Sequence, residues 1–239
     1  MYNVSLNLAC SRSRMIGFYR LAERASTMSA NVLIIGENGV GKEHLARQIH
    51  RLRDPEEKNF RVYRCHANER DFIEIKKLFH DSIYRRAVDS PATIYLKSLE
   101  EVDLKYQLQL LELLEEKQFL HLLEETDFNS RPRLICSCAI EGSLKTEGML
   151  QQRLAYRLDV IHIEIPPLRE RTEEILPLAD LFLQECKVKY GKPLKGFSPN
   201  VRNRLLRHLW PGNVRELRNV VERSVMLSKG EIVESVFLN

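Results

Sequence analysis

The sequence predicts an α/β domain with a parallel sheet and helices on both faces, followed by a small α-helical domain. Three observations predict this arrangement. Short apolar runs alternate with amphipathic stretches over residues 1–167, as expected for strands joined by crossover helices. A glycine-rich loop follows the first apolar run, and from residue 168 onward only helical patterns occur. We therefore expect two domains, residues 1–167 and residues 168–239.

The first elements of the chain surround the glycine-rich loop. Apolar residues at helical spacing predict a helix over 13–24, and the continuous apolar run 32–35 predicts the first strand. After the loop, an amphipathic stretch predicts a helix over 44–52. A strand over 61–65 and a helix over 72–79 follow. The loop therefore lies between a strand and a helix, which is the context that a phosphate-binding loop needs.

The loop itself has the composition of a phosphate-binding loop. It consists of Gly36, Glu37, Asn38, Gly39, Val40, Gly41, Lys42 and Glu43. Glycines allow backbone N–H groups to approach a phosphate, and the next helix directs its positive end toward the same anion. Lys42 adds a cationic side chain for the outer phosphates. A glycine-rich turn with a chance lysine is the disfavoured alternative, because spacing and context occur together.

The second half of the α/β domain continues the alternation. Its expected strands are 93–96, 134–138 and 160–165, and its expected helices are 103–116 and 148–158. The continuous apolarity of 93–96 predicts a strand inside the sheet. The helix 103–116 is expected to be strongly amphipathic, with Leu108, Leu111 and Leu114 on one face.

The C-terminal domain is expected to contain helices only. Thr172 is expected to begin a long helix and to cap it, with two glutamates in its first turn. Residues 191–198 form a predicted linker, and helices are expected over 199–208 and from Gly212-Asn213 to about Leu227.

Composition limits the class of protein. The chain carries 37 basic and 33 acidic residues, and its net charge of +4 is too small to argue for nucleic-acid binding. It has no signal peptide and no apolar run long enough to span a bilayer, so we expect no membrane partner. Five cysteines without a CxxC pair indicate reduced thiols and a cytoplasmic location. No metal site is expected from Cys136 and Cys138, which we interpret as core residues.

Three stretches together resemble one family. They are the glycine loop with its unusual Glu43, Pro166-Pro167-Leu168-Arg169-Glu170-Arg171, and the run from Trp210 to Arg223, which reads WPGNVRELRNVVER. Nearly the whole chain resembles the central AAA+ domain of bacterial enhancer-binding proteins, the sigma-54-dependent transcription activators. The resemblance implies a P-loop NTPase-like sheet with a helical lid, a Walker A loop for ATP or ADP, and Arg215 as the lid's sensor-II arginine.

The catalytic positions of that family are altered here. Its Walker B strand ends in Asp-Glu, which serve Mg²⁺ and the attacking water, whereas this strand ends in Lys97-Ser98. The resemblance implies Mg²⁺ as a cofactor, but lysine cannot coordinate a cation. Whether this chain binds magnesium is therefore left open by the sequence. The sensor-I position reads Cys138-Ala139, and neither residue positions a water well. No catalytic residue is therefore assigned.

Contacts with neighbouring molecules also depart from the family pattern. Of the two arginines that family members direct into a neighbour's ATP site, one falls at Gln151 and the other at Arg157, with Arg153 as a substitute. The Gly-Ala-Phe-Thr-Gly-Ala loop that contacts sigma-54 is missing from residues 80–92. Contact with sigma-54 through this loop is therefore not expected.

These losses resemble those of VpsR-type regulators, some of whose relatives respond to cyclic di-GMP. We expect a regulatory domain of a transcription factor that binds ATP, ADP or cyclic di-GMP with little or no hydrolysis, so the chain is not expected to be an active enzyme. Arg47 falls where a cyclic di-GMP-responsive flagellar relative contacts its ligand. Guanidinium groups of Arg12, Arg14, Arg85 and Arg86 are further candidates.

Two alternatives stay open. One is an active ATPase that remodels RNA polymerase, with Glu100 or Glu101 supplying the metal ligand and the base. The other is a pure oligomerisation module with a vestigial loop. The resemblance implies self-association as a dimer or hexamer and contact with RNA polymerase. It also implies DNA contact only through a separate domain outside this chain, and a receiver domain of a two-component system.

Overall fold

The computed structural model describes residues 15–28, 30–56, 59–65, 73, 77, 93–115, 133–139 and 152–238. These residues form two compact units. The sheet unit comprises residues 19–36 and the described residues of 42–165, and the lid unit comprises 15–18, 37–41 and 166–238. The loop segment 37–41 therefore belongs to the lid unit, and the predicted boundary at residues 167 and 168 stays a prediction.

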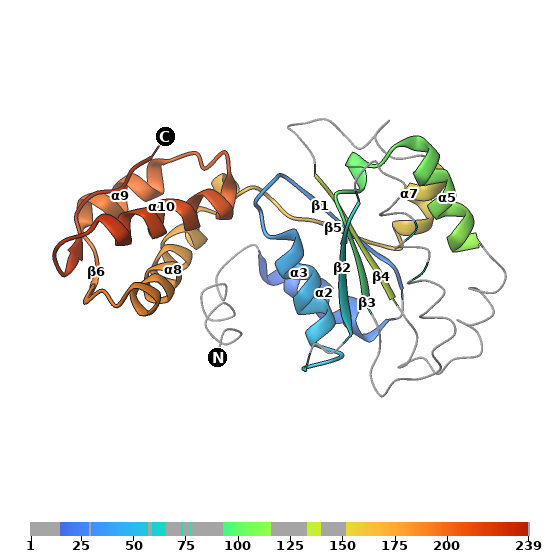
Figure 1. The fold of residues 1–239 in the computed structure, drawn as a ribbon, viewed down its shortest axis with the longest axis horizontal. Helices are drawn as coiled ribbons and strands as arrows, with labels where there is room; N and C mark the ends of the chain where they lie inside the picture. The colour runs from blue at the N-terminus through green and yellow to red at the C-terminus, as the bar shows by residue number, and fades with distance from the viewer. Residues whose placement is uncertain are drawn as a thin grey trace. The chain divides into compact units, whose positions relative to one another are not determined.

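The sheet unit is built on five parallel strands (Figure 1). They are β1 (Val32–Gly36), β2 (Phe60–Arg64), β3 (Thr93–Lys97), β4 (Arg133–Ala139) and β5 (Ile161–Glu164). Their order is β2-β3-β4-β1-β5, and each strand pairs in parallel with its neighbour. The predicted parallel α/β sheet is confirmed, with β3 in its interior.

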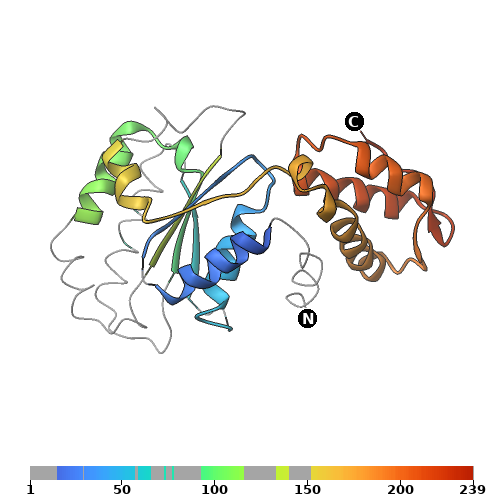
Figure 2. The same ribbon diagram turned by 180° about the vertical axis from the view of Figure 1, so that it is seen from behind.

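Helices cover both faces of this sheet, as Figures 1 and 2 show. Residues 19–27 of α2 (Met15–Thr27) and α3 (Lys42–Arg51) lie on one face, and α5 (Leu104–Glu115) and α7 (Gln152–Leu158) lie on the other. Alternate residues of β1, β3 and β4 pack against α5 and α7 in one apolar core. The helix expected over 72–79 lies outside the described residues apart from Ile73 and Lys77, and 148–151 lie outside them altogether.

The buried face of α5 differs from the prediction. Leu108 is 42% exposed, so the face that carries Leu108, Leu111 and Leu114 is only partly buried. The buried stripe instead includes Gln107, Leu110, Leu111 and Leu114, at the i, i+3, i+4 and i+7 spacing of one helix face. The hydrogen bond that the Gln107 side-chain amide donates to the Val102 carbonyl at 2.9 Å offsets the cost of burying this polar group.

The lid unit is mainly helical. Its elements are η3 (Leu168–Glu170), η4 (Thr172–Glu174), α8 (Ile175–Tyr190), β6 (Gly196–Phe197), α9 (Pro199–Arg207), α10 (Asn213–Leu227) and β7 (Ile232–Val233). Trp210 is fully buried in its core, and its indole N–H donates to the Leu205 carbonyl at 2.9 Å. Ser198 caps α9 by accepting from the Val201 amide.

Two expectations for the lid were wrong. The long helix begins at Ile175 rather than Thr172, because residues 172–174 form a 3₁₀ turn, and the cap position of the helix is Glu174 rather than Thr172. The expected linker 191–198 contains β6, which pairs in parallel with β7. Within the described parts of the chain, no helix combines the length and the apolar character needed to cross a membrane.

Candidate nucleotide-binding site

The carboxyl edge of the sheet presents the ends of β1, β3 and β4. Gly36 pairs with Ala139 across β1 and β4, and Lys97 is the last residue of β3. The helix α3 begins at Lys42, two residues earlier than predicted, so this lysine lies in its first turn. Its ammonium donates to the Gly36 carbonyl at 2.6 Å. The sheet unit thus holds Lys42 at the end of the strand that precedes the loop.

The loop segment 37–41 is held within the lid unit by Asn213. This side chain is fully buried, and its Nδ2 donates to Glu37 Oε2 and to the Asn38 carbonyl, both at 3.0 Å. Its Oδ1 accepts from the Leu168 amide at 2.7 Å. Asn213 has a φ of 53°, a left-handed conformation that asparagine tolerates better than most residues. One amide therefore joins the loop segment to the first residues of the lid and of α10.

Two arginines of the Pro-Pro-Leu-Arg-Glu-Arg stretch hold the same loop segment. Arg169 Nη1 lies 2.9 Å from Glu37 Oε2 in an ion pair at the surface. Arg171 is buried, where its Nη2 donates to the Val40 carbonyl at 2.8 Å and its Nη1 pairs with Glu174 at 3.0 Å. These contacts give the stretch a structural role.

The backbone of Arg215 contacts the glycine loop. Its amide donates to the Gly39 carbonyl at 3.3 Å. Gly39 has a φ of +81°, and a Cβ there would lie 2.3 Å from the Gly212 carbonyl oxygen. Only glycine allows this close approach of the two backbones. Contact of the Arg215 guanidinium with a phosphate stays a prediction.

An ion pair connects α3 with the end of β3. Lys97 Nζ lies 2.8 Å from Glu43 Oε2, and Glu43 Oε1 also accepts from Arg47 at 3.1 Å. Burial alone would raise the pKa of Glu43, but hydrogen bonds from Lys97 and Arg47 outweigh it and lower that pKa. The Arg47 guanidinium also lies 4.8 Å from the centre of the Phe60 ring. The sequence analysis did not predict this ion pair. The signal for it was the opposite charge of Glu43, after the loop lysine, and of Lys97, at the end of a strand.

The turn after Lys97 carries the two glutamates considered as alternative catalytic groups. Ser98 has a φ of 63° and leads into η1 (Leu99–Glu101). Glu101 is engaged by Arg64, with Nη2 3.2 Å from its Oε1. Glu100 Oε2 is buried and has no hydrogen-bond partner among the described residues.

Cys138, at the position expected to sense the nucleotide, is a buried thiol. Burial raises its pKa to about 12, with the charge of Glu100 as a further cause. Cys138 is therefore a neutral thiol near pH 7. Its neighbour Ala139 ends β4 and offers no polar side chain.

Magnesium does not fit the residues present. P-loop NTPases hold it through the Ser or Thr after the loop lysine and through a Walker B aspartate. Here the first position is Glu43, and the ammonium of Lys97 already lies against its carboxylate. Among the residues that the structure describes, no three His, Cys, Asp or Glu side chains form a cluster that could hold a metal ion.

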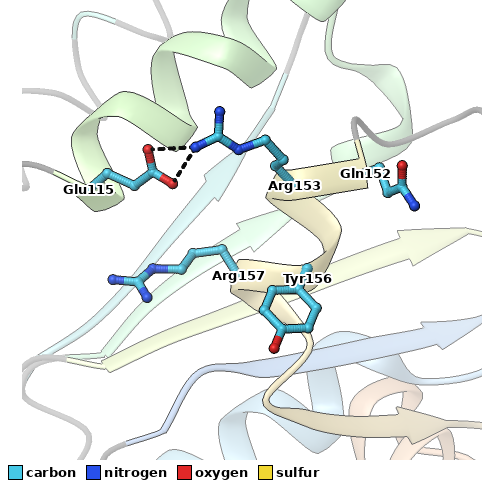
Figure 3. A pocket seen from close by; sticks show the side chains of 5 residues that line it. All are labelled: Glu115, Gln152, Arg153, Tyr156 and Arg157. Atoms are coloured by element: carbon cyan, nitrogen blue, oxygen red, sulfur yellow. Dashed lines mark hydrogen bonds and ion pairs between the residues drawn. The ribbon is translucent and has the colours of Figure 1, made fainter.

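The arginines predicted to enter a neighbour's site line an exposed hollow of about 390 Å³ beside α7 (Figure 3). Arg153 pairs with Glu115 of α5, with Nη2 3.3 Å from Oε1. Arg157 Nη2 lies 3.5 Å from the Leu114 carbonyl. Tyr156, between them in sequence, is 88% exposed. Gln151 lies outside the described residues.

Sheet order, glycine loop and helical lid together define the class of AAA+ P-loop domains. Residues 12–168 match the sigma-54 interaction domain family, and residues 169–239 match the AAA+ ATPase lid domain. The chain belongs to the sigma-54 interaction domain family. The expected AAA+ fold with its lid is thereby confirmed.

Curated relatives are similar over most of the chain. The alginate biosynthesis transcriptional regulatory protein AlgB of Pseudomonas putida is 32% identical over 231 residues, covering 92% of this chain and 52% of AlgB. The transcriptional regulatory protein ZraR of Escherichia coli is 33% identical over 215 residues, covering 85% of this chain and 49% of ZraR. The chain therefore spans about half the length of these relatives.

Solved structures agree with this assignment. NtrX from Brucella abortus in complex with ATP superposes with a TM-score of 0.70 at 27% identity, over 89% of this chain and 51% of NtrX. Its complex with ADP gives a TM-score of 0.66 at 25% identity, over 91% of this chain and 50% of NtrX.

Proposed function

We propose that this chain is a regulatory AAA+ domain of a transcription factor that binds ATP or ADP with little or no hydrolysis. The observation that carries the proposal is the ion pair between Lys97 and Glu43, which lies beside an intact loop lysine. Binding groups are thus retained where catalytic groups are altered. A VpsR-type mode of action, without contact to sigma-54 through the usual loop, is part of the proposal.

Retention of binding is supported by Lys42 and the start of α3. Lys42 is fixed at the loop by the Gly36 carbonyl, an acceptor that a bound phosphate oxygen would replace. The positive end of α3 favours an anion at the same place. NtrX, of the same fold, has been solved with ATP and with ADP. Loop residues 36–43 and Arg215 are the proposed contacts.

Loss of hydrolysis is supported by the ends of β3 and β4. Phosphoryl transfer depends on a bound cation and on a group that orients the attacking water. Lys97 stands where the cation-binding aspartate would be and cannot bind the cation. Ser98 stands where the catalytic glutamate would be and is a poor base for the attacking water. Ala139 has no polar side chain to report the state of the γ-phosphate. Removing such groups takes away most of the rate, because this chemistry relies on positioning and charge stabilisation.

Binding and turnover are tested on the same preparation. Calorimetry should detect ATP and ADP, and binding should be lost in Lys42→Ala while the folded state is retained. Phosphate release should stay at background in the wild type. Absence of heat with both nucleotides would refute the binding proposal, and phosphate release lost in Lys42→Ala would refute the loss of hydrolysis.

Cyclic di-GMP is the second candidate ligand. Arg47 favours it, because its guanidinium is partly exposed on α3 and lies over Phe60. A guanidinium can bind both a phosphate and a guanine edge. Calorimetry with cyclic di-GMP and an Arg47→Ala variant tests this candidate. Heat that is unchanged in the variant, or absent in the wild type, would eliminate Arg47 as the contact.

Residual ATPase activity is a second candidate function. Glu100 favours it, because one of its carboxylate oxygens is buried without a partner among the described residues. An unpaired carboxylate of this kind could accept a proton from water. Turnover lost in Glu100→Gln but retained in Glu101→Gln would support this function over the first.

From the family we also propose that the protein self-associates and contacts RNA polymerase. Contact with DNA is proposed to be made by a separate domain. Arg157 and Arg153 are the proposed contacts to a neighbouring molecule, since both lie beside the exposed Tyr156. Light scattering with and without ATP tests this. An Arg157→Ala chain that assembles as the wild type does would remove Arg157 from the interface.

A further inference from the structure

The ion pair between Lys97 and Glu43 lies where P-loop proteins bind their metal ion. Those proteins hold Mg²⁺ through the residue after the loop lysine and through a Walker B carboxylate. Glu43 occupies the first of these positions, and Lys97 ends the strand that would carry the second. Their side chains meet at 2.8 Å. An ammonium group therefore lies against the carboxylate that a metal ion would need.

We propose that Lys97 supplies the positive charge that a divalent ion supplies in related loops, so that ATP and ADP bind this chain independently of Mg²⁺. This inference rests on the proposed function, since it concerns the ligand of the same site. It goes further by assigning a ligand contact to Lys97 and by specifying the ionic state in which the nucleotide is bound.

The balance of charge supports this assignment. An acidic residue at position 97 beside Glu43 would place two negative charges together, and such a pair requires a divalent cation for neutrality. Lys97 with Glu43 is already neutral, and Arg47 at 3.1 Å from Glu43 adds a positive charge. A magnesium ion would have to displace Lys97 and would meet repulsion from both cations. The site is therefore complementary to a phosphate without metal.

Lys97 is also free to reach a ligand. Its side chain is 35% exposed, and in the described structure its ammonium makes one hydrogen bond, to Glu43. An ammonium has three donors, so two remain for phosphate oxygens. The backbone behind it is fixed, because the Lys97 carbonyl accepts from the Cys65 amide at 2.8 Å and Ser98 turns the chain in a left-handed conformation. The Lys97 backbone is thus fixed, while its ammonium group is available to a ligand.

Equilibrium binding of ATP and ADP to the chain of residues 1–239, in Mg²⁺ and in EDTA, tests the inference. We expect the dissociation constants in the two buffers to agree within about threefold. An affinity at least about tenfold higher in Mg²⁺ would overturn the inference and leave the proposed function standing. Absence of binding in both buffers would overturn the proposed function together with the inference.

Two variants locate the effect at Lys97. Lys97→Asp should lower the affinity in EDTA by at least about tenfold and should regain affinity when Mg²⁺ is added, since it creates the missing carboxylate pair. Lys97→Met should lose affinity in EDTA and gain nothing from Mg²⁺. It keeps the apolar part of the side chain and so covers the case in which Lys97→Asp fails to fold.

Lys229→Asp is the matched control, because Lys229 is exposed in the lid unit and the change in net charge is the same. It should bind as the wild type does in both buffers. Equal losses in Lys97→Asp and Lys229→Asp would show a general effect of net charge and would contradict a direct role for Lys97.

Discussion

Lys97 Nζ lies 2.8 Å from Glu43 Oε2, although the two residues are 54 positions apart in sequence. The pair joins the end of β3 to the first turn of α3, next to the loop lysine. In this family fold the same place would serve a metal ion and its catalytic water. The proposed function, nucleotide binding without turnover, rests on this salt bridge beside the loop lysine.

The acidity of Glu43 should depend on Lys97. Burial raises its pKa, and the hydrogen bonds from Lys97 and Arg47 lower it below the ordinary value of 4.5. Because the pKa in the folded state is depressed, the stability that Glu43 contributes is present above pH 4.5 and is lost as pH falls through the lowered pKa. Lys97→Met should raise the pKa of Glu43, as followed by carbon-13 NMR of its carboxyl group. The control Lys229→Met should leave the pKa of Glu43 unchanged. A wild-type pKa of Glu43 in Lys97→Met would contradict the ion pair between Lys97 and Glu43.

Gly39 should not tolerate a side chain. Gly39→Ala places a Cβ 2.3 Å from the Gly212 carbonyl oxygen and forces alanine into a φ of +81°. We expect a loss of about 1–3 kcal/mol in the free energy of unfolding, measured by denaturant titration. Gly230→Ala is the control, because its Cβ would meet nothing within 4 Å, and it should change stability by less than about 0.5 kcal/mol. Equal stability of the two variants would show that the two backbones are not in close contact.

Asn213 should be needed as an amide. Asn213→Asp keeps the shape but removes the two donated hydrogen bonds, and it adds a charge beside Glu37. We expect a loss of about 1–3 kcal/mol in the free energy of unfolding of the lid unit. The exposed Asn203 supplies the control, since Asn203→Asp makes the same chemical change on the surface of α9. A wild-type melting curve for Asn213→Asp would refute the role of this amide.

Arg133 should stabilise the opposite edge of the sheet. It is 2% exposed, and its guanidinium donates to the Ala25 carbonyl at 2.6 Å and to the Ile49 carbonyl at 3.0 Å. These carbonyls lie near the C-terminal ends of α2 and α3, where a positive charge is favourable. Arg133→Met should lower the free energy of unfolding by about 1–3 kcal/mol, because it leaves both carbonyls buried without these bonds. Arg223→Met on the exposed side of α10 should have little effect, and similar losses in both variants would contradict this role.

Local patterns were sufficient to predict most of the fold. The interior strands β1 and β3 are short apolar runs, and the loop is recognised by its glycines, so these features are encoded by neighbouring residues. The first residues of helices were harder to predict. The 3₁₀ turn at 172–174 has the same sequence features as the first turn of an α-helix. The exposure of Leu108 and the pairing of β6 with β7 depend on tertiary contacts that no local pattern carries.

The candidate site could be predicted only in part. The altered residues at 97, 98 and 139 are visible in the sequence once the family pattern is known. The contact of Lys97 with Glu43 is not, since it depends on how the fold brings β3 and α3 together. The same holds for Asn213, whose three hydrogen bonds reach residues 45 to 176 positions away.

Nucleotide binding without turnover is the central claim, and single-turnover phosphate release at saturating protein tests it most directly. Radiolabelled ATP is first shown to be bound, and release of phosphate is then followed in Mg²⁺ over many hours. The account predicts that bound ATP is recovered intact, and that Lys42→Ala loses the bound ATP. Conversion of bound ATP to ADP at a rate that Lys42→Ala abolishes would contradict it.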